Sequence, residues 1–101
     1  DKMNVQMIVT GISNVYKSPK LKVYPNPVEN NLNINFQLTE PQYVKIKIIN
    51  NLGQDVFKEV HESFSGTYNK EINVSGFSPG VYFVQVFTEG NEVSKKIILT
   101  K

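Results

Sequence analysis

His61 and Glu62 form the adjacent pair of side chains best suited to chemistry, because His61 is the only histidine among the 101 residues. A histidine can serve as a general acid or base or as a metal ligand, but both roles need partners that converge in one site. The nine Asp and Glu residues are scattered along the chain with no convergent pair. We therefore predict that His61 is an ordinary exposed surface residue, with no catalytic residue, metal or cofactor in the domain.

Other segments with chemical meaning are equally weak. The loop NPVENN, residues 26–31, offers Glu29 and several Asn side chains to calcium but lacks the aspartates that such loops use. None of the serines in the predicted turns stands in a G-x-S-x-G sequence, and no glycine cluster precedes a helix. Several aromatic residues could form a sugar-stacking platform, although residues of this kind in a small domain usually fill the core. They are Phe64, Tyr68, Phe77, Phe83 and Phe87.

Composition describes an ordinary globular domain of mild charge. Eleven Lys against nine acidic residues give a net charge of +2, and Arg, Ala and Trp are absent. Without Arg, the residue that best reads phosphate and guanine, nucleic acid is not an expected partner. The absence of Ala disfavours long helices, whereas frequent Val, Ile, Phe, Tyr and Thr favour strands.

Cysteine, signal and membrane features are all missing from the sequence. With no Cys there can be no disulfide, zinc-thiolate site or thiol catalysis. No charged segment followed by an apolar stretch resembles a signal peptide, and no apolar run approaches the roughly 20 residues of a membrane-spanning helix. Because the chain begins with Asp1, we expect it to be a fragment from the end of a longer protein.

Alternating apolar and polar residues predict strands along most of the chain. Pro41 is expected to end one strand, "NNLGQ" to form a turn around Gly53, and "HESFSG" at 61–66 to be a loop. Residues 81–88 are apolar on both faces, which predicts a central strand that is covered on both sides. The predicted strands are residues 21–23, 32–39, 44–48, 55–60, 68–74, 81–88 and 93–100.

These strands predict an all-β fold, an antiparallel β-sandwich of about seven short strands with immunoglobulin-like character. Residues 1–20 lack the regular pattern apart from Val5, Met7 and Val9, and are interpreted as an upstream cargo remnant and linker. Residues 21–101 form the domain itself. The alternative, in which Val5–Val9 adds a strand to the same sheet, stays open.

Four sequence blocks resemble the type A C-terminal sorting domain of the type IX secretion system, the Por system. They are "YPNP" at 24–27, "NNLGQ" at 50–54, "FSPGVYFVQV" at 77–86 and a basic final strand that ends in lysine. Their order is more specific than any single block, and the resemblance covers about four-fifths of the chain. Phe77 stands where the family often has leucine. The residues that carry the resemblance are Tyr24, Pro25, Asn26, Pro27, Gly53, Gln54, Gly80, Tyr82, Lys95, Lys96 and Lys101.

The resemblance implies a secretion signal rather than an enzyme. Members direct a folded periplasmic cargo across the outer membrane of Gram-negative bacteria, and a sortase-like peptidase then removes the domain. The implied partners are the secretion machinery, the peptidase and a covalently linked N-terminal cargo, with no transmembrane segment in this chain. The implied location is the periplasm in transit to the outer membrane, cell surface or extracellular space.

The final strand, Val93–Lys101, is the predicted recognition edge. Lysines on an edge strand discourage aggregation, and an open edge also permits strand addition to a receptor. Edge protection alone remains an alternative role for Lys95, Lys96 and Lys101. The alternative function is a non-catalytic carbohydrate- or protein-binding module of a cell-surface protein, and a passive spacer between domains is a further one.

Overall fold

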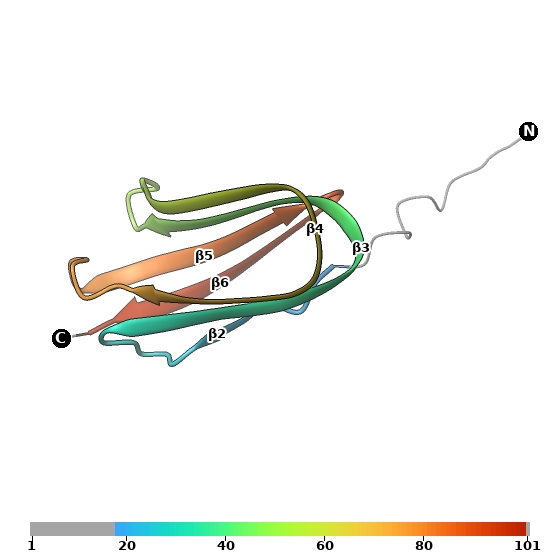
Figure 1. Cartoon of the computed structure of the whole chain (residues 1–101). Helices are drawn as coiled ribbons and strands as arrows, with labels where there is room; N and C mark the ends of the chain where they lie inside the picture. Colours follow the sequence, from blue (N-terminus) through green and yellow to red (C-terminus); the bar gives the residue numbers. More distant parts are fainter. Residues whose placement is uncertain (1–17, 101) are drawn as a thin grey trace, which may run out of the picture.

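The computed structural model describes residues 18–100, and these form one curled antiparallel sheet with no helix. Its strand order is β2-β3-β5-β6, and β4 pairs with β3 (Figure 1). The predicted all-β antiparallel fold is therefore confirmed. The strands are β2 (Lys22–Tyr24), β3 (Asn31–Asn50), β4 (Asp55–Asn73), β5 (Gly80–Thr88) and β6 (Asn91–Leu99).

Two long strands account for the difference between five strands and the predicted seven. The predicted strands at 32–39 and 44–48 are the two ends of β3, and those at 55–60 and 68–74 are the two ends of β4. Pro41 does not end β3, because the ladder with β4 is already interrupted there by shifts of register between Leu38 and Val44. The predicted loop at 61–66 is likewise part of β4.

The bend in β3 and β4 divides the sheet into two arms that face each other (Figure 1). The short arm is formed by β2, residues 31–39 and residues 66–73. The long arm is formed by residues 42–50, residues 55–64, β5 and β6. Gln42 is buried at the bend, where its side-chain oxygen accepts a hydrogen bond from the backbone N–H of Glu89 at 3.1 Å. This bond ties the bend to the β5–β6 turn.

One apolar core lies between the arms. Inward positions alternate along each strand, and their side chains belong to a single cluster drawn from both arms. Burying each aliphatic side chain of this kind stabilises the fold by about 1.5–3 kcal/mol. The fully buried members include Leu32, Ile34, Phe36, Ile46, Ile48, Val84, Val86 and Ile97.

The curl is closed where the β2–β3 connection meets β6. Val28, which is fully buried, forms an isolated parallel bridge with Leu99. Its N–H donates to the carbonyl of Ile98 at 2.8 Å, and its carbonyl accepts from the N–H of Thr100 at 2.8 Å. The two ends of the strand order, β2 and β6, are therefore linked through the connection that follows β2.

Candidate functional site at the motif end

The Pro-Asn-Pro segment packs along the outer edge of the last strand. We call residues 25–28 the strap. Both Tyr24–Pro25 and Asn26–Pro27 peptide bonds are cis. The Asn26 side-chain amide donates to the carbonyl of Lys96 at 3.1 Å, and its oxygen accepts from the N–H of Ile98 at 3.0 Å. A single carboxamide thus occupies the two edge groups that a paired strand would otherwise occupy.

Strap contacts divide the β6 edge into two halves. The hydrogen bonds to the strap show that residues 96, 98 and 100 direct backbone groups away from β5. The alternation along β6 therefore places the backbone groups of Glu92 and Ser94 on the same outer side. The strap covers the edge from the Lys96 carbonyl to Thr100. Within the described part of the chain, no strand pairs with the outer side at 92–94. The predicted open edge is therefore only half open.

The turn "NNLGQ" joins β3 to β4 and is organised by Asn50. The Asn50 oxygen accepts from the N–H groups of Leu52 and Gln54, both at 2.9 Å, while its amide donates to the Gln54 side chain at 2.8 Å. Gly53 has φ = 82°, a left-handed conformation that L side chains rarely adopt. Its predicted positive φ is confirmed. Leu52 at the tip is 78% exposed.

Tyr82 connects the remaining blocks. It lies opposite Asn50 on β3 and opposite Ile97 on β6. Its hydroxyl donates to the carbonyl of Ser78 and so fixes the turn before β5, and its ring lies 5.8 Å from that of Phe77 between centroids. Gly80, with φ = 148°, lies opposite Leu99, two residues from Tyr82 at the same end of the β5–β6 pairing.

All four sequence blocks meet at one end of the molecule, which we call the motif end. It is the left end in Figure 1, where the turns at 50–54 and 74–79, the strap and the end of β6 gather. Among the predicted residues, Lys95 and Lys96 are exposed on β6, and Tyr24 is 47% exposed at the end of β2. Lys101, like the alternation at Val5–Val9, lies outside the described residues.

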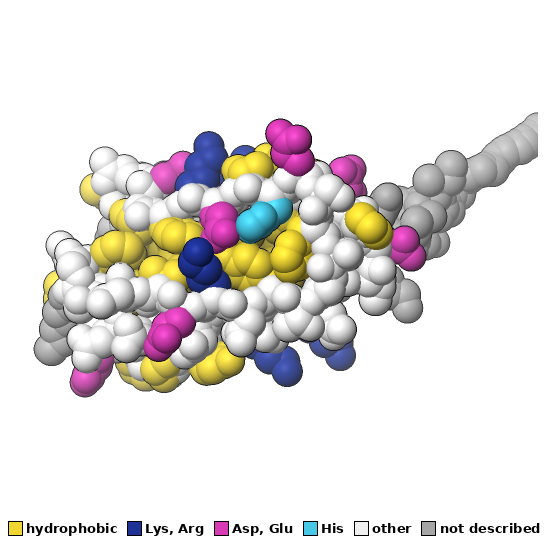
Figure 2. All heavy atoms as spheres, in the orientation of Figure 1, with side chains coloured by type: hydrophobic (Ala, Val, Ile, Leu, Met, Phe, Trp, Pro, Cys, Tyr) yellow, Lys and Arg dark blue, Asp and Glu magenta, His cyan; other side chains and the backbone are white. Residues whose placement is uncertain are grey.

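A polar cluster between the arms was missed by sequence reasoning. The Tyr68 hydroxyl donates to Glu59 at 2.7 Å, Lys70 Nζ lies 3.5 Å from the same oxygen, and His61 Nε2 lies 2.9 Å from the other. We call these four residues the clasp. It joins the two ends of β4 over the hydrophobic side chains that remain visible between the arms (Figure 2). His61 is thus partly buried and paired, contrary to its prediction as an exposed surface residue.

Electrostatics favour an ionised carboxylate in the clasp. Partial burial alone would raise the pKa of Glu59, but hydrogen bonds from Tyr68 and His61 and the charge of Lys70 outweigh it and lower the pKa. For Tyr68, burial and the hydrogen bond to Glu59 both raise the pKa of the phenol. The clasp is therefore a stable ion-pair and hydrogen-bond network at neutral pH.

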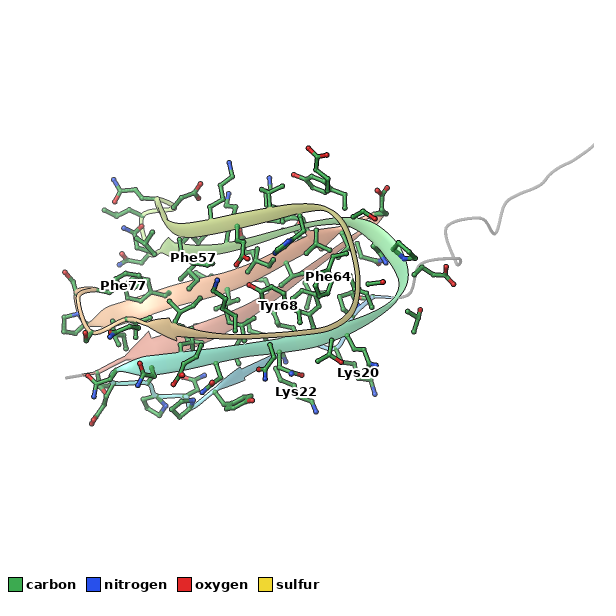
Figure 3. The ribbon with its side chains drawn as sticks, in the orientation of Figure 1. Lys20, Lys22, Phe57, Phe64, Tyr68 and Phe77 are labelled. Atoms are coloured by element: carbon green, nitrogen blue, oxygen red, sulfur yellow. The ribbon has the colours of Figure 1, made fainter. Side chains whose placement is uncertain are left out.

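Aromatic residues beside the clasp form packing rather than a platform. The rings of Phe36 and Tyr68 stack with centroids 4.8 Å apart, and Phe64 meets both edge-on. Phe64 and Tyr68 lie together between the arms in Figure 3, while Phe57 and Phe77 are nearer the motif end. Phe83 and Phe87 are different, because they point to the outer face of the long arm and lie outside the core cluster.

The described residues contain no group of three His, Asp or Glu side chains close enough to hold a metal ion. Over the same range, no helix long and apolar enough to cross a membrane occurs.

The sequence profile of the secretion system C-terminal sorting domain matches residues 22–100. The chain belongs to this family. The match begins at β2 and includes the strap, both motif turns and all of β6, so it spans every strand of the described residues. No curated protein matches the chain.

Family membership makes this domain a C-terminal sorting signal of type IX secretion. A sorting tail of this kind implies contact with the type IX machinery and transit to the outer membrane or cell surface. The family also indicates a non-enzymatic tail of a cargo protein.

Proposed function

We propose that residues 21–101 direct a folded N-terminal cargo from the periplasm through the outer membrane by the type IX system, after which a sortase-like peptidase removes them. Residues 1–20 are then the cargo remnant and linker. The observation that carries this proposal is the convergence of the motif residues on one end of the domain. A receptor that contacts the strap, the Asn50 turn and β6 together would read all four blocks at once.

Strand addition at the open half of β6 is the proposed mode of recognition. The outward backbone groups of Glu92 and Ser94 can pair with an extended receptor segment, as in other cases of β-augmentation. The strap limits such pairing to the first half of the strand, because the groups at Ile98 are already bonded to Asn26 and Val28. Exposed Lys95 and Lys96 flank this half and would favour an acidic receptor segment.

Deleting β6 is a poor test, because Ile97 and Leu99 are buried in the core and the truncated domain would unfold. A proline at position 94 is sharper. The Ser94 N–H points away from β5, so Ser94→Pro removes an edge donor without removing a bond of the β5–β6 ladder. Asn69→Pro is the matched control, since the Asn69 N–H points to the unpaired edge of β4 by the same alternation.

The test uses the full chain behind a folded reporter with its own signal peptide, in a host with a working type IX system. Surface and periplasmic reporter are measured for the unchanged chain and both variants. The proposal expects surface display of the unchanged chain, retained display with Asn69→Pro and loss with Ser94→Pro. Periplasmic reporter for the unchanged chain would reject the secretion proposal. Normal display with Ser94→Pro would reject recognition at this edge. Mass spectrometry of released reporter would show whether a peptidase cuts before residue 21.

A further inference from the structure

The outer face of the long arm carries a row of apolar side chains that no described strand covers. Residues 81–88 were expected to be covered on both faces, but only the inward residues of β5 lie in the core cluster. On the outer side, Phe83 lies between Ile49 and Lys96, and Val81 lies opposite Ile98, which is 40% exposed. The covering expected from the sequence is therefore missing over residues 18–100.

Lysines surround these apolar residues. Phe87 lies opposite Lys45, whose Nζ is 4.8 Å from the ring centroid, and Lys47 Nζ is 5.8 Å from the same ring. Lys58 lies beside Lys47 on β4, and Lys96 beside Phe83 on β6. We call this surface the lysine-aromatic face. It consists of Lys45, Lys47, Ile49, Lys58, Val60, Val81, Phe83, Gln85, Phe87, Glu92, Ser94, Lys96 and Ile98.

Charge separates this face from the outer face of the short arm. The lysine-aromatic face has four Lys and one Glu, and Asp55 at its margin pairs with Lys47 at 3.2 Å. The short arm instead presents mostly polar uncharged side chains, with Asn33, Asn35 and Gln37 on β3, and one exposed aromatic side chain, Tyr24, opposite Asn33. The long arm thus combines a row of several apolar side chains with surrounding lysines, and an apolar patch with a polar rim is typical of a docking surface.

We propose that the lysine-aromatic face docks a protein of the secretion machinery through a surface with an apolar centre and an acidic rim. The inference rests on the proposed secretion function and assigns that partner a second contact, made through side chains of the sheet face and not through the backbone groups of the β6 edge. A second copy of this chain is a poor occupant, because a symmetric contact would oppose the same lysines. A lipid bilayer is disfavoured because the apolar side chains are interspersed with lysines across a sheet face and form no separate apolar segment that could insert.

The test reverses charge on each outer face by the same amount. Lys45→Glu with Lys58→Glu changes the lysine-aromatic face, and Lys20→Glu with Lys22→Glu changes exposed lysines at the short arm (Figure 3). Both double variants carry the same net charge. In the reporter assay, the first is expected to lower surface display roughly tenfold, as a loss of about 1.4 kcal/mol of docking free energy would do. The second should leave display within about twofold of the unchanged chain, since the proposed partner does not contact the short arm.

A third variant and two binding measurements separate the other outcomes. Phe83→Thr keeps every charge and removes the central ring, and Thr is a β-branched residue that favours strands. It should therefore also reduce display while the purified chain still unfolds cooperatively. Equal losses in both charge variants, or normal display in all three, would overturn the proposal. Flotation with vesicles of phosphatidylglycerol and phosphatidylethanolamine that depends on Lys45 and Lys58 would assign the face to lipid instead. Sedimentation of a dimer through this face would assign it to self-association. Failure of the unchanged chain to reach the surface would reject the secretion function itself.

Discussion

The strap offers the most direct check of the structure, through replacement of Asn26 by Ala. This change removes two hydrogen bonds, from the Asn26 amide to the Lys96 carbonyl and from the Ile98 N–H to the Asn26 oxygen. Each bond contributes about 0.5–1.5 kcal/mol, and water can replace part of it at this exposed site, so we expect a loss of about 1–2 kcal/mol. For a domain of this size that is a fall in Tm of roughly 4–15 °C.

Two assays measure the effect of Asn26→Ala. Thermal and urea unfolding of the full chain give the loss of stability, and amide hydrogen exchange gives its location. The Ile98 amide should exchange faster than the amides of β5, because only its partner has been removed. Asn26→Asp should fall between the unchanged chain and Asn26→Ala, since a carboxylate still accepts from Ile98 but cannot donate to Lys96.

Asn69→Ala is the matched control, because Asn69 is an exposed amide on β4 for which the structure gives no side-chain hydrogen bond. Its Tm should stay within about 2 °C of the unchanged chain, as most surface substitutions change stability by less than about 0.5 kcal/mol. If Asn26→Ala and Asn69→Ala have the same Tm, and the Ile98 amide keeps its protection, then the strap does not hold the β6 edge as described.

Three further predictions concern the clasp, the core and the Asn50 turn. Glu59→Gln should destabilise the domain by about 1 kcal/mol at pH 7. Because folding lowers the pKa of Glu59, the stabilisation by its carboxylate is complete above the ordinary pKa of 4.5 and disappears as the pH falls through the folded-state pKa. The urea midpoints of the two proteins should therefore converge in acid. A constant difference between the midpoints down to pH 2 would contradict this. Phe36→Ala should cost about 3–5 kcal/mol, measured by urea unfolding, because a fully buried ring stacked on Tyr68 is lost; a cost below about 1 kcal/mol would exclude the packing described. Gly53→Ala should lower the free energy of unfolding by about 1–2 kcal/mol, because the backbone φ of Gly53 is 82°. Gly76→Ala, at a glycine without positive φ, should lower it by less, and thermal unfolding of both variants would measure the difference.

Alternation of side chains made most of the strands predictable. Leu32, Ile34 and Phe36 alternate with Asn and Gln, and the structure places the first set in the core and the second outside. The pattern could not reveal that two such strands are continuous, because Pro41 usually ends a ladder. In the structure Pro41 stands where the register shifts between Leu38 and Gln42 have already interrupted the pairing. Bends of this kind depend on partner strands that a single segment does not identify.

Contacts between distant residues were beyond the sequence pattern. Asn26 is separated from Ile98 by 72 positions, and no periodicity links a loop amide to a strand edge. The clasp left a weak signal, since Glu59 and Lys70 are polar residues at inward positions of predicted strands. Only the bend in β4 brings them together with Tyr68. Local backbone conformation was easier to predict, since the turn sequence around Gly53 already indicated its positive φ.

The motif residues themselves were found through resemblance, and their convergence needed the structure. Tyr82 and Gly53 belong to blocks that are far apart in sequence, yet Tyr82 lies opposite Asn50, the residue that organises the Gly53 turn. The sequence predicted the last strand as an edge but could not indicate that Asn26 and Val28 cover half of it.

The closure of the curl also determines how the domain carries mechanical load. In the proposed function, a cargo attached before β2 would pull on the domain through residue 18. Such a pull would load the β2–β3 ladder and then the bonds of Asn26 and Val28 to β6, because the strap follows β2 directly in the chain. On that proposal, the bonds that close the curl would help the domain to stay folded under tension from its N-terminal side.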